Sequence, residues 1–263
     1  MLFMDNLTFL QNFQALEYSI MGDKLVYLGF ASITFNYQDR SSPWNHALLY
    51  QNIDLGQLHT IEIALEELER PAAVYFESSE QSGQITNLLL VQNYEKGWDD
   101  SWMFHQGQNI DTSRFALVTK VETEQDLEVF LETSDKCFVK DDPQNPYGEL
   151  GDYKGIAKEA WHHHHANNRI EYFIISDSGN PVAVSALTNF AGIGYISNVA
   201  SLMNVRGQGF GKIATMYCVN KSVANGNNLH CLATEEGKYP NEFYKRIGFE
   251  TKFRAEGYVK RSN

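Results

Sequence analysis

The chain has few cysteines, few basic residues and no long apolar run. Its 263 residues include 3 cysteines, Cys137, Cys218 and Cys231, an odd number without the spacing of metal ligands. We therefore expect free thiols, buried where Cys218 and Cys231 fall in apolar helix and strand patterns. No apolar stretch approaches the length of a membrane span, and residues 1–6 lack a basic, signal-like start. We expect a soluble, cytoplasmic protein with no membrane partner.

Basic residues are outnumbered by acidic ones, mainly in the first half. The chain has 21 Lys and Arg against 33 Asp and Glu, a formal net charge of −12. Residues 1–113 hold 4 basic and 15 acidic residues, or −11, and residues 114–263 hold 17 and 18, or −1. Because affinity for nucleic acid comes mainly from Lys and Arg, no nucleic-acid partner is expected. The acidity favours a cationic amine partner or serves solubility, and both interpretations stay open.

A glycine-rich loop stands where an apolar strand-like run gives way to a helix-like run. The strand-like run covers residues 195–202, the helix-like run covers residues 213–224, and between them lies Val205-Arg206-Gly207-Gln208-Gly209-Phe210-Gly211-Lys212. Glycine lets the backbone turn sharply and aim several N–H groups at one point. The helix adds unpaired amides and the positive end of its dipole. The sequence therefore predicts a phosphate or pyrophosphate site.

Spacing excludes two familiar phosphate loops. A dinucleotide-binding loop needs a glycine where Lys212 stands, and a Walker loop needs Ser or Thr where Ile213 stands. A turn that binds nothing would need one glycine rather than three alternating ones. What remains is Arg206-x-x-Gly209-x-Gly211, which resembles the acetyl-CoA pyrophosphate loop of the GNAT N-acetyltransferase superfamily.

A second motif strengthens this resemblance. After a strand-like segment at residues 229–233 and a polar loop at residues 234–240, Tyr244-Lys245-Arg246-Ile247-Gly248-Phe249 resembles the family's late helix, which ends in Tyr-x-x-x-Gly-Phe. Gly248 stands where a helix favours a left-handed C-terminal residue, and Phe249 begins the next strand.

The resemblance implies an acetyl-CoA-dependent N-acetyltransferase, in which a primary amine of a small molecule or peptide attacks the thioester directly. It implies that Tyr244 protonates the leaving thiolate, although a tyrosine that only packs its ring is the alternative. Acetyl-CoA is a co-substrate here, and no metal is implied. The implied donor-binding residues are Val199, Ala200 and Ser201 for the pantetheine and thioester, and Arg206, Gly207, Gln208, Gly209, Phe210, Gly211 and Lys212 for the pyrophosphate.

The sequence departs from the family at the general base. Many members carry a glutamate on the strand before the loop, but residues 194–198 contain no carboxylate. The general base is therefore unassigned, and two alternatives stay open. One is a water that Ser197 or Asn198 holds and that relays the proton, and the other is the carboxylate of Glu235 or Glu236. The missing glutamate also keeps an alternative function open, a non-catalytic acyl-CoA-binding or sensing protein. A further option is an acyltransferase that transfers a larger acyl group or that acts on a peptide end.

A polar stretch near residues 107–114 divides the chain. We expect a catalytic GNAT domain at residues 114–263, a mixed α/β fold with a mostly antiparallel sheet flanked by helices. Residues 1–113 are expected to form a smaller, degenerate GNAT-like α/β domain, because residues 54–58 keep one glycine and no arginine where the loop would stand. A homodimer is compatible with the sequence.

The pattern also predicts individual elements. In the second half it indicates a strand at 115–118, a helix capped by Thr123, an acceptor-side loop at 141–148 and a hairpin of strands at 170–176 and 182–187. In the first half it indicates strands at 24–35, 47–53 and 72–76 and helices at 59–70 and 85–94. The run His162–His165 does not predict a metal site, because four consecutive side chains cannot converge on one ion.

Overall fold

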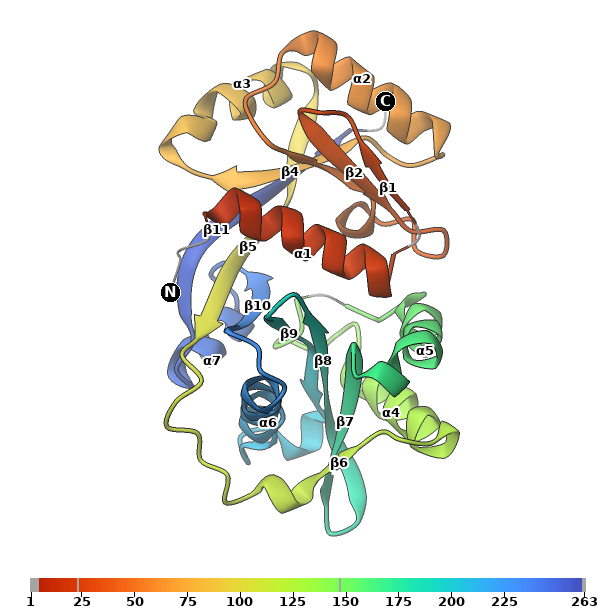
Figure 1. Cartoon of the computed structure of the whole chain (residues 1–263), viewed down its shortest axis with the longest axis vertical. Helices are drawn as coiled ribbons and strands as arrows, with labels where there is room; N and C mark the ends of the chain where they lie inside the picture. Colours follow the sequence, from red (N-terminus) through yellow and green to blue (C-terminus); the bar gives the residue numbers. More distant parts are fainter. Residues whose placement is uncertain (1–4, 23, 147, 262–263) are drawn as a thin grey trace. The chain divides into compact units, whose positions relative to one another are not determined.

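The chain folds into two compact units, seen in a computed structural model that describes residues 5–22, 24–146 and 148–261 (Figure 1). One unit contains Met1–Trp102 and Lys252–Asn263, and the other contains Met103–Thr251. This division by contacts differs from the expected division after residue 113. The reason is strand pairing: β11 (Glu250–Lys260) pairs antiparallel with β4 (Ala73–Ser78), so the end of the chain belongs by contacts to the first unit.

The first unit is a helix-flanked sheet with strand order β1-β2-β3-β4-β11-β5. Of its registered pairs, β3 and β4 run parallel, and β1 with β2, β2 with β3 and β4 with β11 run antiparallel. Its remaining elements are α1 (Asn6–Ile20), β1 (Lys24–Tyr27), β2 (Ala31–Phe35), β3 (His46–Leu49), α2 (Leu55–Glu67), α3 (Gly83–Val91) and β5 (Tyr94–His105), which continues into the second unit.

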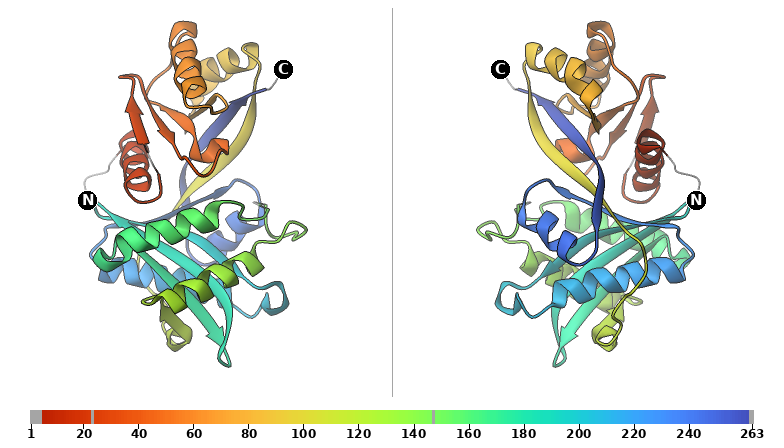
Figure 2. Two further views of the ribbon diagram at one scale, coloured as in Figure 1. Left: turned by 90° about the vertical axis from the view of Figure 1, so that its right-hand side faces the viewer. Right: turned by 90° about the vertical axis from the view of Figure 1, so that its left-hand side faces the viewer.

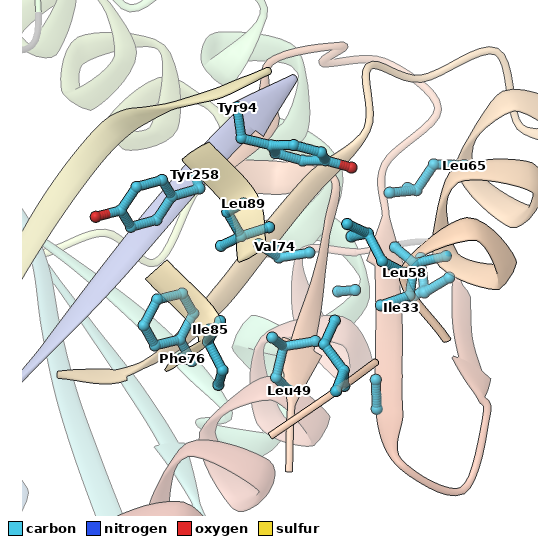
Figure 3. Close-up of a cluster of buried hydrophobic side chains, with 14 residues drawn as sticks. Ile33, Leu49, Leu58, Leu65, Val74, Phe76, Ile85, Leu89, Tyr94 and Tyr258 are labelled. Atoms are coloured by element: carbon cyan, nitrogen blue, oxygen red, sulfur yellow. The ribbon is translucent and has the colours of Figure 1, made fainter. Parts of the chain in front are cut away.

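Strand alternation sorts the side chains of this sheet onto two faces. Ile33 and Val74 point to the face where Leu58 of α2 and Leu89 of α3 pack, and all four are fully buried (Figure 3). Ser32, the neighbour of Ile33, points the other way and is hydrogen-bonded to a side chain of α1. The unit therefore has helices on both faces of its sheet.

The second unit has strand order β10-β9-β8-β7-β6, with β9 and β10 parallel and the other neighbours antiparallel. Helices α4 and α5 cover one face of this sheet and α6 covers the other (Figure 2). The elements are β6 (Val118–Lys120), α4 (Glu124–Cys137), α5 (Tyr153–His164), β7 (Ile170–Asp177), β8 (Asn180–Phe190), β9 (Ile193–Ser201), α6 (Phe210–Ala224), β10 (Leu229–Glu235) and α7 (Tyr239–Arg246).

Local sequence signals explain several of these elements. The side chains of Thr123 and Asp126 form a reciprocal capping box at the start of α4, as the sequence predicts. The predicted hairpin of β7 and β8 is present, with Gly179 at φ +81° in its turn. The helix predicted before Gly248 is α7, and the mixed, mostly antiparallel α/β fold is confirmed.

Two strand predictions were wrong in detail. Residues 24–35 form the β1–β2 hairpin instead of one strand, because Gly29 adopts φ +82° and turns the chain. Residues 115–117 form a short 3-10 helix, and the strand begins only at Val118. The sequence also did not predict β5, because its residues are largely polar or charged. Two of them, Lys96 and Asp99, form an ion pair with each other on the strand.

The three cysteines are free and buried, as expected. Burial raises the pKa of the Cys137 and Cys218 thiols to about 12, which suppresses their thiolate forms. Within the described residues, no helix combines the length and the apolar character that crossing a membrane requires.

Candidate functional site

Strands β9 and β10 pair only at their first residues. Their register runs from Ile193 opposite Leu229 to Tyr195 opposite Cys231. On its other edge β9 is irregular: the register with β8 shifts between Val184 and Ala186, and Asn198 adopts φ +49° at this bulge.

The end of β9 is paired on one side only. Ala200 and Ser201 pair with β8, and neither has a registered partner on β10. Val199, Ala200 and Ser201 are half-buried. The predicted pantetheine-binding residues therefore lie together on a strand with one edge available for an extended ligand.

The loop after β9 requires glycine for its backbone conformation. Gly207 has φ +78° and Gly209 has φ +86°, and a Cβ on Gly207 would meet no atom within 4 Å. Conformation, rather than lack of space, is therefore the reason for glycine at Gly207. Gly209 also precedes α6, whose start has no side-chain cap hydrogen bond, and a Cβ there would lie 3.4 Å from Nη1 of Arg114.

The start of α6 has backbone amides without helical partners. The first backbone bond of the helix joins the N–H of Ile213 to the carbonyl oxygen of Gly209 at 3.1 Å. The N–H groups of Phe210, Gly211 and Lys212 therefore lack acceptors within the helix. The Phe210 side chain is buried in the core, so this residue offers the site its backbone alone. Together with the helix dipole, these amides form an anion site of the predicted kind.

Two exposed cations flank this site. Lys212 belongs to the predicted loop and is exposed, as is Arg114. Nη1 of Arg114 donates to the carbonyl oxygen of Gln208 at 3.0 Å, and the guanidinium lies 5.1 Å from the centre of the Phe210 ring. Sequence reasoning missed Arg114, because it lies 94 residues before its partner and no local pattern marks it.

The Arg206 side chain pairs with Asp142. Both guanidinium Nη atoms donate to the carboxylate, whose side chain has no exposed surface. The hydrogen bond from Arg206 is the main reason that the pKa of Asp142 lies below its usual range. The pair joins the turn after β9 to the segment after α4, within the loop predicted on the acceptor side.

Tyr244 is held by the end of α7. The N–H of Phe249 donates to the carbonyl oxygen of Tyr244 at 3.1 Å, and that of Gly248 donates to Lys245 at 3.2 Å. Gly248 has φ +100°, which confirms the predicted left-handed residue at this helix end, and the two bonds together make a Schellman motif. The Tyr244 ring is half-buried, 5.7 Å from the Phe249 ring and 5.1 Å from the Phe243 ring, centre to centre.

Of the candidate bases, Asn198 has a clear partner. Its side-chain amide exchanges hydrogen bonds with the Ser134 hydroxyl of α4, at 3.1 and 3.0 Å. Glu235 ends β10 and lies 3.8 Å from Nζ of Lys238.

The four histidines at the end of α5 point to different partners. His162 lies 3.0 Å from Glu124, whereas His165 stacks on Trp161 with ring centres 3.8 Å apart. In the part of the chain that the structure describes, no group of three or more His, Cys, Asp or Glu side chains is arranged to hold a metal ion.

The parallel β9-α6-β10 unit, with its glycine loop and diverging strands, matches a known family. Residues 127–249 match the model of the acetyltransferase (GNAT) family. These residues form a GNAT domain. The N-terminal half also matches GNAT folds, and the family match together with the fold supports an acyltransferase. A comparison with curated proteins found no match.

Solved structures share the fold along almost the whole chain. A GCN5-related N-acetyltransferase from Kribbella flavida is 17% identical, with a TM-score of 0.68 over 95% of this chain and 95% of its own. One from Sphaerobacter thermophilus is 15% identical, with a TM-score of 0.62 over 90% and 83%. A tandem GNAT protein from the clavulanic acid biosynthesis pathway is 9% identical, with a TM-score of 0.54 over 89% and 79%. At these identities the likeness concerns the fold alone.

Proposed function

We propose that the chain is an acetyl-CoA-dependent N-acetyltransferase that acts on a primary amine. One observation carries the proposal: within a GNAT domain, two glycines with positive φ lead into a helix whose first three N–H groups are unpaired. A pyrophosphate carries the negative charge and the acceptor oxygens that these amides and the flanking Arg114 and Lys212 attract.

In this proposal the donor extends from the loop along the open edge of β9. Backbone groups of Val199, Ala200 and Ser201 bind the pantetheine and polarise the thioester carbonyl. The acceptor nitrogen attacks the carbonyl carbon, the carbon–sulfur bond breaks, and Tyr244 gives its proton to the thiolate. The acetylated amine and coenzyme A leave.

The amine must lose a proton before or during attack. No carboxylate is present at residues 194–198, and the amide of Asn198 is not basic and is engaged by Ser134. We therefore propose that water, rather than a group of residues 194–198, accepts this proton, with Glu235 and Glu236 as the remaining candidate carboxylates, and that the Asn198–Ser134 pair holds the β9 bulge in shape. A rate that rises with pH until the acceptor amine is deprotonated is the expected consequence.

The test is release of coenzyme A by the purified full-length protein. Acetyl-CoA is supplied with a panel of polyamines, aminoglycosides, amino acids and peptides with free N-termini, and thiol release is followed together with the mass of the product. We expect amine-dependent release and a product heavier by one acetyl group. Tight coenzyme A binding without turnover across the panel would instead support the acyl-CoA sensor. Absence of binding would contradict both functions.

A further inference from the structure

Among the described ion pairs of the second unit, the pair between Arg206 and Asp142 is distinguished by its double hydrogen bond, and its carboxylate is fully buried, as that of Glu171 is in its pairs with lysines. The Asp142 side chain is 0% exposed and that of Arg206 is 19% exposed. Both Nη1 and Nη2 of Arg206 donate, one to each carboxylate oxygen. A forked contact of this kind fixes the orientation of both groups as well as their distance.

The segment that carries Asp142 is ordered by its own hydrogen bonds. The Asp142 carboxylate also accepts the N–H of Gln144 at 2.9 Å. The N–H of Asn145 donates to the Asp142 carbonyl at 3.0 Å, and the Asn145 side chain donates to Gly148 at 2.7 Å. Asp142 is thus placed by its own turn, and Arg206 is the partner that is held.

Energetics argue against Arg206 leaving this pair for a phosphate. Removing one partner of a buried ion pair strands the other charge without a counter-ion, which is costly. The anion site does not need the guanidinium, because three helix N–H groups, Lys212 and Arg114 already face or flank it. The Arg206 guanidinium therefore stays paired with Asp142 and is not needed to bind the phosphate.

We propose that Asp142 is a positioning residue for the donor loop: by holding the Arg206 guanidinium it fixes the turn at residues 206–209 in the shape that binds pyrophosphate, while the guanidinium makes no contact with the phosphates. The inference rests on the proposed function of that loop. In the opposite arrangement, Asp142 would withhold Arg206 from the phosphates. The two arrangements predict changes of opposite sign.

Calorimetric titration of the full-length protein with coenzyme A separates them. We expect Asp142→Asn and Arg206→Ala each to weaken binding about tenfold, and the double variant to bind no more weakly than Arg206→Ala alone, because both changes disturb one contact. Arg206→Lys, which keeps the charge but loses the fork, should lie between wild type and Arg206→Ala. The matched control is Asp141→Asn, an exposed neighbour whose loss should leave affinity unchanged.

With a substrate amine in hand, the kinetic constants give a second readout. KM for acetyl-CoA should rise in Asp142→Asn while kcat at saturating donor stays within about twofold, a split that general loss of folded protein would not produce. Equal or tighter coenzyme A binding by Asp142→Asn would overturn the positioning role, as would additive losses in the double variant. Failure of the wild type to bind coenzyme A would overturn the proposed function instead.

Discussion

At the scale of single residues, Tyr244 has the clearest proposed chemical role. Replacing it by Phe removes the hydroxyl and keeps the ring that contacts Phe243 and Phe249. We expect coenzyme A affinity to be unchanged and turnover to fall ~10²-fold, because general acid catalysis contributes at least that much. Steady-state kinetics with chemistry shown to be rate-limiting is the measurement. Tyr217→Phe, whose ring packs on Phe115 and Phe173, is the control, and an unchanged rate in Tyr244→Phe would assign the proton to water.

Asp142 predicts a pH dependence of stability. Its pKa in the folded protein lies below the ordinary value of an aspartate, chiefly because Arg206 donates to it. The native state then binds fewer protons than the unfolded chain, so the stabilisation is complete above about pH 4 and is lost as the pH falls through the folded pKa.

We therefore expect Asp142→Asn to lower the free energy of unfolding at neutral pH and to flatten its further decline in acid. Urea unfolding at a series of pH values measures both effects, with Asp141→Asn as the control. Parallel acid slopes for wild type and Asp142→Asn would contradict the assignment.

At the scale of elements, the sequence predicted what local chemistry determines. The Thr123 capping box, the β7–β8 hairpin, the glycines of the donor loop and the Gly248 helix end are each encoded within a few neighbouring residues. Contacts between distant segments have no such local code, and the Arg206–Asp142 pair spans 64 residues. The same reasoning explains why β5 and the change of unit at β11 were not predicted: a strand partner is chosen in three dimensions, not by neighbours in sequence.

The end of α7 gives a test at this scale. Gly248 has φ +100°, and a Cβ there would lie 3.1 Å from Nε2 of His105. Gly226 has φ +80° with no atom near its Cβ position. We expect Gly226→Ala to cost about 1 kcal/mol from backbone conformation alone, and Gly248→Ala to cost more because the His105 ring must also shift to accommodate the Cβ. Denaturant unfolding compares them, and a smaller loss for Gly248→Ala would refute the structural role of this helix end.

At the scale of the whole molecule, both units contain the same strand–helix–strand connection, but a different residue stands at the start of the helix in each. In both, a helix crosses between parallel strands, from β3 through α2 to β4 and from β9 through α6 to β10. In the first unit Asp54 precedes the helix, and its carboxylate accepts the N–H of Gln57 at 2.8 Å. In the second unit Gly209 precedes the helix and offers no side chain. An acidic cap occupies the amides that a phosphate would use and repels its charge.

This difference predicts one donor site per chain. Titration with coenzyme A should saturate at one equivalent, with no second event at higher concentration. Two equivalents would show that the Asp54 cap does not close the first unit to the ligand, and Asp54→Asn would then be the variant that locates the second site.

The central claim, that the loop ending at Gly209 binds the donor's pyrophosphate, is tested most directly by calorimetric coenzyme A binding to Gly209→Asp. A carboxylate at this position would bring negative charge to the unpaired N–H groups of α6 and repel the phosphate. Because Gly209 is left-handed at φ +86°, whereas the capping residue Asp54 is extended at φ −93°, the variant also carries a backbone cost that its control must share. Gly179→Asp is the matched control. Gly179 has a similar positive φ of +81° and open space around its Cβ position, and it lies in the β7–β8 turn, outside the donor loop. We predict one coenzyme A bound by wild type and by Gly179→Asp, and none detectable for folded Gly209→Asp. Equal affinity in all three proteins would contradict the account.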